Sequence, residues 1–282
     1  MTRLATMQVW NVELGLAIHI KAPNGKYIVI DLGRKNNFSP LYQLKNEKVG
    51  YMVITHPHKD HIEDISNISY ARPEVLWRVK SFSREELLDK AQNESDVDII
   101  NRYCNFIDGY NGSLSDEKDP TTNNPFNGLT AEVFQTSLCG KSNINNFSGI
   151  VVLKLGLMKI VICGDNESAS FNILMERSDF KNAIKDTDIL VAAHHGRESG
   201  FHNDFVSLAN PLLTIVSDTK NPDTTASSRY SAKSRGLNVY DGSGKCNFRK
   251  CLTTRSDGSI RVIFGESSSS QYRGTLRVET EF

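Results

Sequence analysis

The sequence predicts an α/β protein, an αββα sandwich that forms one domain over residues 1–282. Short apolar runs of strand length occur in two groups, one in each half of the chain, and helical patterns lie between and outside them. In addition, strands of both groups run directly into loops that contain histidine and aspartate. Side chains that can bind metal ions are therefore expected at the end of a sheet. A variable insertion is expected around residues 80–128.

The first half of the chain should begin with a β-hairpin. Apolar residues alternate over 7–20 and continue over 27–32, and the Pro-Asn-Gly-Lys segment at 23–26 between them is a turn signal. The fully apolar run 49–54 is typical of a buried strand. A helix over 62–70 and a short strand over 74–79 are expected to follow it.

The capping-box sequence Ser-Arg-Glu-Glu at 83–86 predicts a helix that starts near Arg84, and the helical pattern continues to about Asp108. Residues 111–128 are rich in Asn, Asp, Ser, Thr, Gly and Pro. This segment is either a substrate-contacting flap or an inert surface loop.

The second half supplies the other strands of the sandwich. Helices are expected over 166–185, capped by Asn166, and over 227–235. Strands are expected over residues 131–136, 149–155, 159–163, 188–193, 212–217, 237–241, 258–264 and 275–279.

Charge and composition narrow the possible partners. The 33 basic and 33 acidic residues cancel, so a general attraction to nucleic acid is excluded, although a local basic patch is not. No apolar run approaches the ~20 residues of a transmembrane helix, and no membrane partner is expected. The first residues lack the apolar core of a signal peptide, so we expect a cytoplasmic protein whose cysteines are free thiols.

The strand at 49–54 leads into the hexapeptide His-Pro-His-Lys-Asp-His at 56–61, which holds three of the seven histidines. His56 and His58 are two residues apart and point the same way in extended backbone. Imidazoles and a carboxylate together suit zinc, manganese or iron. The alternative, a polar surface loop, would give this cluster no function.

Two further sites follow predicted strands: Asp165 after Gly164, and the pair His194 and His195. A two-metal centre needs several imidazole nitrogens and a bridging carboxylate, with the ions roughly 3.5–4 Å apart. Asp165 is the candidate bridge. The sequence therefore predicts two divalent ions, Zn or Mn, held by residues from both halves of the chain.

The pattern His56-x-His58-x-Asp60-His61, the Gly164-Asp165 pair and the late His-His-Gly resemble the metallo-β-lactamase superfamily. Within it, the chain is similar to the hydrolase domain of ComEC-type competence proteins and their free-standing relatives. The resemblance covers most of the chain and implies the αββα sandwich of that superfamily, with metal-dependent hydrolysis.

The resemblance also implies roles for single residues. His56 and His58 would hold the first ion. Asp60, His61 and either His194 or His195 would hold the second, and Asp165 would bridge them. The histidine of the pair that is not a ligand would donate a proton to the leaving group, and Asp60 would also orient the attacking water. Asp31 would form hydrogen bonds that orient the metal-binding histidines.

The chain departs from the family pattern at three places. Glu63 and Asp64 stand where a glycine is widespread, and no histidine lies between His61 and His194, where the superfamily has its mid-chain ligand. Arg197 replaces the family's serine after His-His-Gly. A guanidinium beside the metals would suit a phosphate, so Arg197 is a third catalytic candidate with Asp60 and His194.

Three functions are consistent with the sequence. The first is a phosphodiesterase, with DNA as a possible substrate. The second is a hydrolase of a small ester, lactone or signalling nucleotide. The third is a weakly active subunit of a multi-protein defence or DNA-uptake system, with partner proteins encoded elsewhere. We favour the hypothesis that the protein is a phosphodiesterase.

Overall fold

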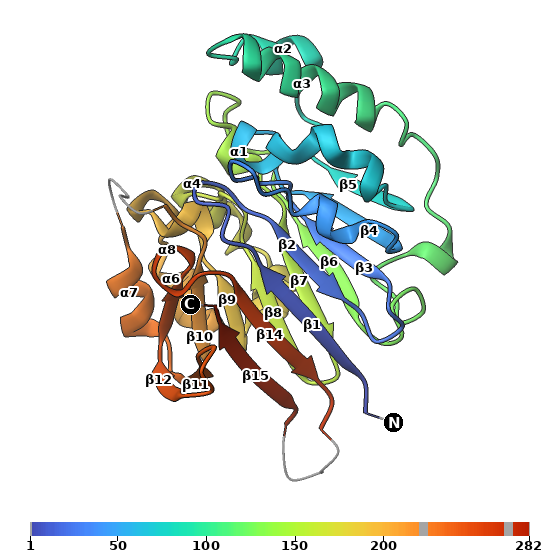
Figure 1. The fold of residues 1–282 in the computed structure, drawn as a ribbon. Helices are drawn as coiled ribbons and strands as arrows, with labels where there is room; N and C mark the ends of the chain where they lie inside the picture. The colour runs from blue at the N-terminus through green and yellow to red at the C-terminus, as the bar shows by residue number, and fades with distance from the viewer. Residues whose placement is uncertain (1, 220–224, 268–272, 282) are drawn as a thin grey trace.

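The computed structural model describes residues 2–219, 225–267 and 273–281, and it confirms the αββα sandwich. Two β-sheets face each other in the centre of the molecule, and helices cover their outer faces (Figure 1). The residues between the sheets form one apolar cluster with members from both halves of the chain, which include Met7, Val53, Leu153 and Ile215. Burial of these side chains is the main force that holds the two sheets together.

The first sheet has nine strands within the described residues. In spatial order they are β12 (Cys246–Arg249), β11 (Leu237–Tyr240), β15 (Thr275–Thr280), β14 (Ile260–Gly265), β1 (Leu4–Val9), β2 (Ile18–Lys21), β3 (Tyr27–Ile30), β4 (Val49–Ile54) and β5 (Val75–Arg78). Strands β3, β4 and β5 are parallel, so their carboxyl ends lie at one edge of the sheet.

The second sheet has six strands in the part of the chain that is described. Their order is β13 (Cys251–Thr253), β10 (Leu213–Val216), β9 (Ile189–Val191), β8 (Met158–Ile162), β7 (Ile150–Leu155) and β6 (Thr130–Phe134). Strands β13, β10, β9 and β8 are mutually parallel, and their carboxyl ends also share one edge. Residues after parallel strands are therefore gathered at the ends of both sheets.

Helices complete the two outer layers. On the nine-stranded sheet lie α1 (Lys59–Ile62), α2 (Arg84–Leu88), α3 (Glu94–Ile107) and the 3-10 helices η1 (Leu41–Leu44) and η2 (Glu63–Tyr70). On the six-stranded sheet lie α4 (Ser168–Leu174), α5 (Ser178–Ile184), α6 (Asn203–Ala209) and α7 (Ser227–Lys233). The remaining helical segments are α8 (Thr254–Asp257), η3 (Asp116–Lys118), η4 (Ile144–Phe147), η5 (Ala193–Gly196) and η6 (Glu198–Gly200). No helix in the described ranges is long and apolar enough to cross a membrane.

Most expected strands are confirmed, but four expected elements are wrong in detail. The alternation over 7–20 is interrupted by a loop in which Glu13 and Gly15 have positive φ, so it forms two strands. The expected helix over 84–108 is two helices, because the Asn93 side chain caps a second start by accepting from the Asp96 amide.

The other two corrections concern helices next to the predicted metal residues. The expected helix over 62–70 begins earlier, at Lys59, and continues as a 3-10 helix. The expected helix over 166–185 is broken between α4 and α5. Asn166 does not cap it, because its amide donates to the carbonyl oxygens of Ser148 and Cys163 instead.

His19 is a buried group that should make stability depend on pH. Burial lowers its pKa to about 3, and its Nδ1 accepts a hydrogen bond from Trp10 Nε1, which needs a neutral ring. In the unfolded chain His19 binds a proton near pH 6.5. The contribution of the neutral, buried ring to the free energy of unfolding is therefore complete above that pH and is lost as pH falls toward 3. Between pH 7 and 5 we expect the free energy of unfolding to fall by about 2 kcal/mol on this account.

Urea denaturation at several pH values measures this effect. The variant His19→Asn keeps an acceptor for Trp10 at the position of Nδ1 but cannot titrate, so its stability should fall less over the same pH range. An identical pH slope in both proteins would show that His19 is not the group responsible.

Candidate metal centre

The carboxyl ends of three strands bring the predicted metal residues together. The hexapeptide 56–61 follows β4 in the nine-stranded sheet, while Asp165 follows β8 and His195 follows β9 in the six-stranded sheet. Although they are separated by up to 139 positions, these segments meet because the two sheets pack face to face with the same ends adjacent.

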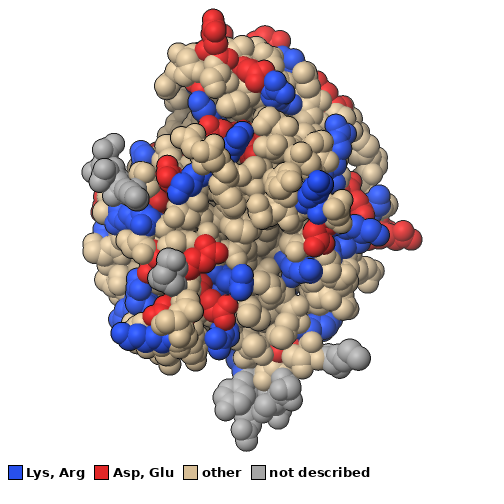
Figure 2. All heavy atoms as spheres, viewed as in Figure 1, with Lys and Arg blue, Asp and Glu red and all other residues tan. Residues whose placement is uncertain are grey.

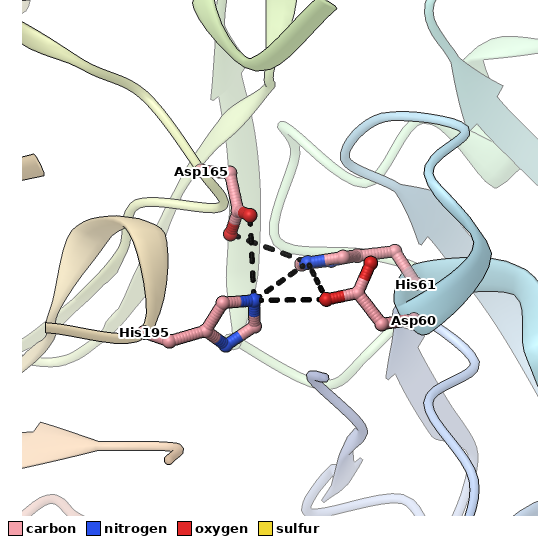
Figure 3. Close-up of side chains that lie close together, drawn as sticks. All are labelled: Asp60, His61, Asp165 and His195. Carbon is pink, nitrogen blue, oxygen red and sulfur yellow. Dashed lines mark hydrogen bonds and ion pairs between the residues drawn. The ribbon is translucent and has the colours of Figure 1, made fainter. Parts of the chain in front are cut away.

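Four of these side chains form a compact group: Asp60, His61, Asp165 and His195 each offer a ligand atom within 4.8 Å of the others (Figure 3). The two oxygens of Asp165 lie 3.2 Å from His61 Nε2 and 3.3 Å from His195 Nε2. Asp60 Oδ2 lies 3.1 Å from the same nitrogen of His195. All except Asp60 are buried.

His56 and His58 lie next to this group, and the His56 ring centroid is 4.1 Å from that of His61. His56 Nε2 is 3.7 Å from Asp165 Oδ2 and 3.1 Å from His58 Nδ1. Burial lowers the pKa of both imidazoles, which leaves them neutral and able to ligate a cation. Asp165 therefore lies within reach of histidines from both sheets, as a bridging carboxylate must, although its role and theirs as ligands stay predictions.

Asp31 fixes the orientation of His61, as the sequence led us to expect. His61 Nδ1 donates to Asp31 Oδ2 at 2.6 Å, which turns Nε2 toward the cluster. The same carboxylate accepts hydrogen bonds from the Thr55 amide and hydroxyl, both at 2.7 Å. A single buried side chain thus connects β3 to the start of the hexapeptide loop.

The His-His-Gly turn sends its two histidines in different directions. His194, His195 and Gly196 have φ values of 48°, 53° and 70°, a left-handed run that is costly for two histidines. A Cβ at Gly196 would come 2.6 Å from Val216, so glycine is required there. Backbone strain of this kind is retained where a site depends on the resulting geometry.

His195 is the member of the pair that enters the cluster, and its Nδ1 donates to the Ser217 carbonyl oxygen at 3.1 Å. His194 lies at the rim instead. Its Nδ1 is 3.1 Å from Glu167 Oε1 and 2.8 Å from Ser199 Oγ. Both histidines were expected near the site as ligand and proton donor; the structure places His195 in the group of four and His194 outside it.

Within the cluster, carboxylates are paired with imidazolium groups. Burial alone would lower the pKa of His195, but Asp165 and Asp60 raise it to about 10. Burial also opposes protonation of His61, yet Asp165 and Asp31 hold its pKa well above the ordinary value. In turn these histidines hold the pKa of Asp165 well below its usual range, against the effect of burial. This buried cluster requires positive charge, and its nitrogen and oxygen donors fit a divalent metal ion.

Metal binding is expected to strengthen as pH rises. A cation must displace the protons of His61 and His195, whose folded-state pKa values are raised, so protons compete with it. The stabilising effect of the His195 proton is complete below pH 6.5 and is lost as pH rises toward 10. As the proton becomes easier to remove, a metal ion can take its place on the imidazole.

Competition with a chromophoric chelator at pH 6, 7 and 8 measures this dependence. The apparent affinity should rise about tenfold or more per pH unit, since at least one proton is released per ion. An affinity that does not change with pH would place the metal elsewhere.

A cavity of about 330 Å³ adjoins the hexapeptide. Its walls come from the hexapeptide on one side and from α2 and α3 on the other. Its lining residues are Pro57, His58, Lys59, Asp60, Leu87, Lys90, Ala91, Gln92, Asp96, Ile100 and Ile144. The segment 80–128, expected as an insertion, thus provides one wall of the approach to the centre. An ion pair of 3.0 Å between Lys59 and Asp96 connects the two walls.

Sequence reasoning missed three charged residues near the centre. Glu167 contacts His194, and Asp218 and Arg255 lie beyond His195, where they form an ion pair of 3.2 Å. Asp218 follows β10 as Asp165 follows β8, so its position after an apolar strand was a usable signal. Arg197, which was predicted, is part-buried. Burial raises the pKa of the Asp218 carboxyl, and the positive charges of Arg255, His195 and Arg197 oppose this effect.

Comparisons with known proteins identify a family for the chain. A family model described as the metallo-beta-lactamase superfamily matches residues 11–211. No curated protein gives a significant match.

Several solved structures resemble the chain at low identity. The metallo-beta-lactamase fold protein YhfI from Bacillus subtilis is 10% identical, with a TM-score of 0.45 over 78% of this chain and 88% of that one. A diphosphatase of the PhnP family is 15% identical, with a TM-score of 0.40 over 78% and 88%. CmlA, a diiron beta-hydroxylase from Streptomyces venezuelae, is 11% identical, with a TM-score of 0.44 over 77% and 45%.

Proposed function

Because this chain belongs to the metallo-β-lactamase superfamily and is a metallo-hydrolase, we propose that it cleaves phosphodiesters. The observation that supports this most directly is that the Asp165 carboxylate lies within 3.7 Å of three imidazole nitrogens, those of His56, His61 and His195. A carboxylate shared by two cations holds them at the spacing that an in-line displacement at phosphorus uses.

Two sequence features support a phosphodiester over other bonds. The motifs that resemble ComEC-type competence proteins favour a nuclease within the superfamily. Arg197 directly follows the His-His-Gly turn, and the planar donors of a guanidinium at this position would match the oxygens of a phosphate.

In the proposed mechanism each group of side chains has a separate task. Divalent ions bound here would lower the pKa of a water molecule and so supply the nucleophile at neutral pH. Asp60, within reach of both His61 and His195, accepts a hydrogen bond that orients the attacking water. His194 is held at the rim through Nδ1 by Glu167, and it can donate a proton to the leaving oxygen.

A small ester, lactone or signalling nucleotide remains the second candidate substrate class. On the face shown in Figure 2, basic and acidic side chains are intermixed and do not form a long basic track. The cavity beside the hexapeptide also has an apolar side, formed by Leu87, Ile100 and Ile144. Both observations favour a short substrate over a long duplex. A nuclease would lose DNA affinity steeply as salt rises, whereas an enzyme of small neutral esters would not.

The deciding experiment measures cleavage of bis(p-nitrophenyl) phosphate and of linear single- and double-stranded DNA, with Zn and Mn added separately. We expect metal-dependent cleavage in the wild type and its loss in His58→Ala. The matched control is His202→Asn, which keeps an acceptor to cap α6 and lies outside the cluster. If neither ion supports cleavage of any phosphodiester, the small-ester candidate replaces this proposal.

A further inference from the structure

The cavity beside the hexapeptide is bounded in part by residues of the proposed metal centre. His58 and Asp60 are among its lining residues, and its volume is about 330 Å³. This volume lies at the lower end of the range for small-molecule sites, ~300–1,000 Å³. A part of the substrate that occupies the cavity would therefore lie next to the group that reacts at the centre.

The wall opposite the hexapeptide is apolar and held in place. Leu87 of α2, Ile100 of α3 and Ile144 of η4 contribute to it, and each is between 3% and 8% exposed because it also packs in the cluster beneath the outer helices. In Figure 1, α3 lies beside α1, and the ion pair of 3.0 Å between Lys59 and Asp96 joins these two helices. The outer helices thus give the cavity a fixed apolar wall.

Two polar side chains at the rim of the cavity have no partner in the protein. Lys90 and Gln92 lie between α2 and α3 and line the cavity, and their side chains form no ion pair or hydrogen bond within residues 2–219, 225–267 and 273–281. The Gln92 backbone amide, in contrast, donates to Asp96 Oδ2 at 3.1 Å. The cavity therefore combines an apolar wall with a cation and a carboxamide, and a simple alkyl ester would leave both of these without a partner.

A nucleoside matches this combination of surfaces. The two faces of a nucleobase can stack on other groups, while its edge carries hydrogen-bond donors and acceptors. One base can therefore contact the wall of Leu87, Ile100 and Ile144 with a face and the Gln92 carboxamide with its edge. A base inside a duplex cannot enter such a cavity, because it is paired and stacked.

We propose that this cavity binds one nucleoside of the substrate, next to the phosphodiester that is cleaved. The inference rests on the proposed function and specifies it: the substrate is a nucleotide ester with an unpaired base, such as a dinucleotide or the end of a single strand. Because the apolar wall comes from α2, α3 and η4, these segments select the substrate, while the hexapeptide and Asp165 belong to the reacting centre.

The first test compares kcat/KM for a thymidine dinucleotide and for its abasic counterpart, which has the same sugars and phosphate but no bases. We expect the wild type to prefer the thymidine dinucleotide at least about tenfold, as burial of one base against an apolar wall would imply. The preference should fall to about one in Ala91→Phe, because a phenyl ring on this part-buried alanine fills the cavity that it lines. The matched control is Ala232→Phe, at an exposed position of α7 that does not line the cavity, and it should keep the preference.

The second test does not depend on turnover. Binding of thymidine to chelator-treated protein is measured by saturation-transfer NMR titration, and Ala91→Phe should bind it at least tenfold more weakly than the wild type and Ala232→Phe. Thermal unfolding of each variant shows whether it folds. If Ala91→Phe does not fold, Ala91→Leu decides the question, because it adds a smaller side chain at the same position.

The outcomes separate the two proposals. Cleavage of both dinucleotides at equal kcat/KM in the wild type, or an unchanged preference and unchanged thymidine binding in Ala91→Phe, overturns the nucleoside site but leaves the phosphodiesterase. Thymidine binding that Ala91→Phe weakens, without cleavage of any phosphodiester, overturns the proposed function but leaves the nucleoside site.

Discussion

Asp165→Ala is expected to abolish hydrolysis and leave the fold intact. Asp165 lies within 3.7 Å of His56, His61 and His195, so its loss removes the carboxylate that these proposed ligands share. We expect kcat/KM to fall at least about 1,000-fold, which is roughly 4 kcal/mol of transition-state stabilisation. The bound metal, measured by elemental analysis, should fall below that of the wild type.

A second variant, Asp165→Asn, preserves the side-chain volume. The hydrogen bond that the Asp165 backbone amide donates to Ser148 Oγ is unaffected in both variants, because it does not use the side chain. Circular dichroism and thermal unfolding should show that both variants fold, since the surrounding histidines can become neutral when the carboxylate is lost. Activity near that of the wild type in either variant would contradict the bridging role.

Asp31→Ala is expected to cause the largest loss of stability and to weaken metal binding as well. The substitution leaves three buried donors without their acceptor: the Thr55 amide, the Thr55 hydroxyl and His61 Nδ1. Loss of such a buried partner costs roughly 3–5 kcal/mol of unfolding free energy. Because His61 also loses the group that orients its ring, metal affinity should fall about 10- to 100-fold.

Urea denaturation and chelator competition measure the two effects separately. Asp31 has a φ of 58°, which asparagine tolerates better than alanine, so Asp31→Asn should lose less stability. It should still weaken metal binding, because an amide presents a donor where His61 Nδ1 needs an acceptor. Wild-type stability in Asp31→Ala would show that the three donors find other partners.

Local sequence patterns were sufficient to predict much of the fold. The apolar run at 49–54 and the capping box at 83–86 are confirmed as β4 and the start of α2, because both signals are complete within a few residues. The helix start at Asn93 was missed, and the cap expected at Asn166 was wrong. The sequence alone does not distinguish an asparagine that caps a helix from one whose side chain is bonded elsewhere. Only the structure shows that the Asn166 amide is already bonded to Ser148 and Cys163.

The residues of the proposed metal centre could be listed without a structure, because the hexapeptide, Asp165 after Gly164 and the histidine pair each follow an apolar strand. Tertiary structure alone decided that His195 enters the cluster while His194 faces Glu167, because a left-handed backbone turn separates the two side chains. It also decided that Arg255 lies beside Asp218. The strands before these residues, β13 and β10, are neighbours only because the intervening β11 and β12 join the other sheet, and no local pattern encodes that pairing.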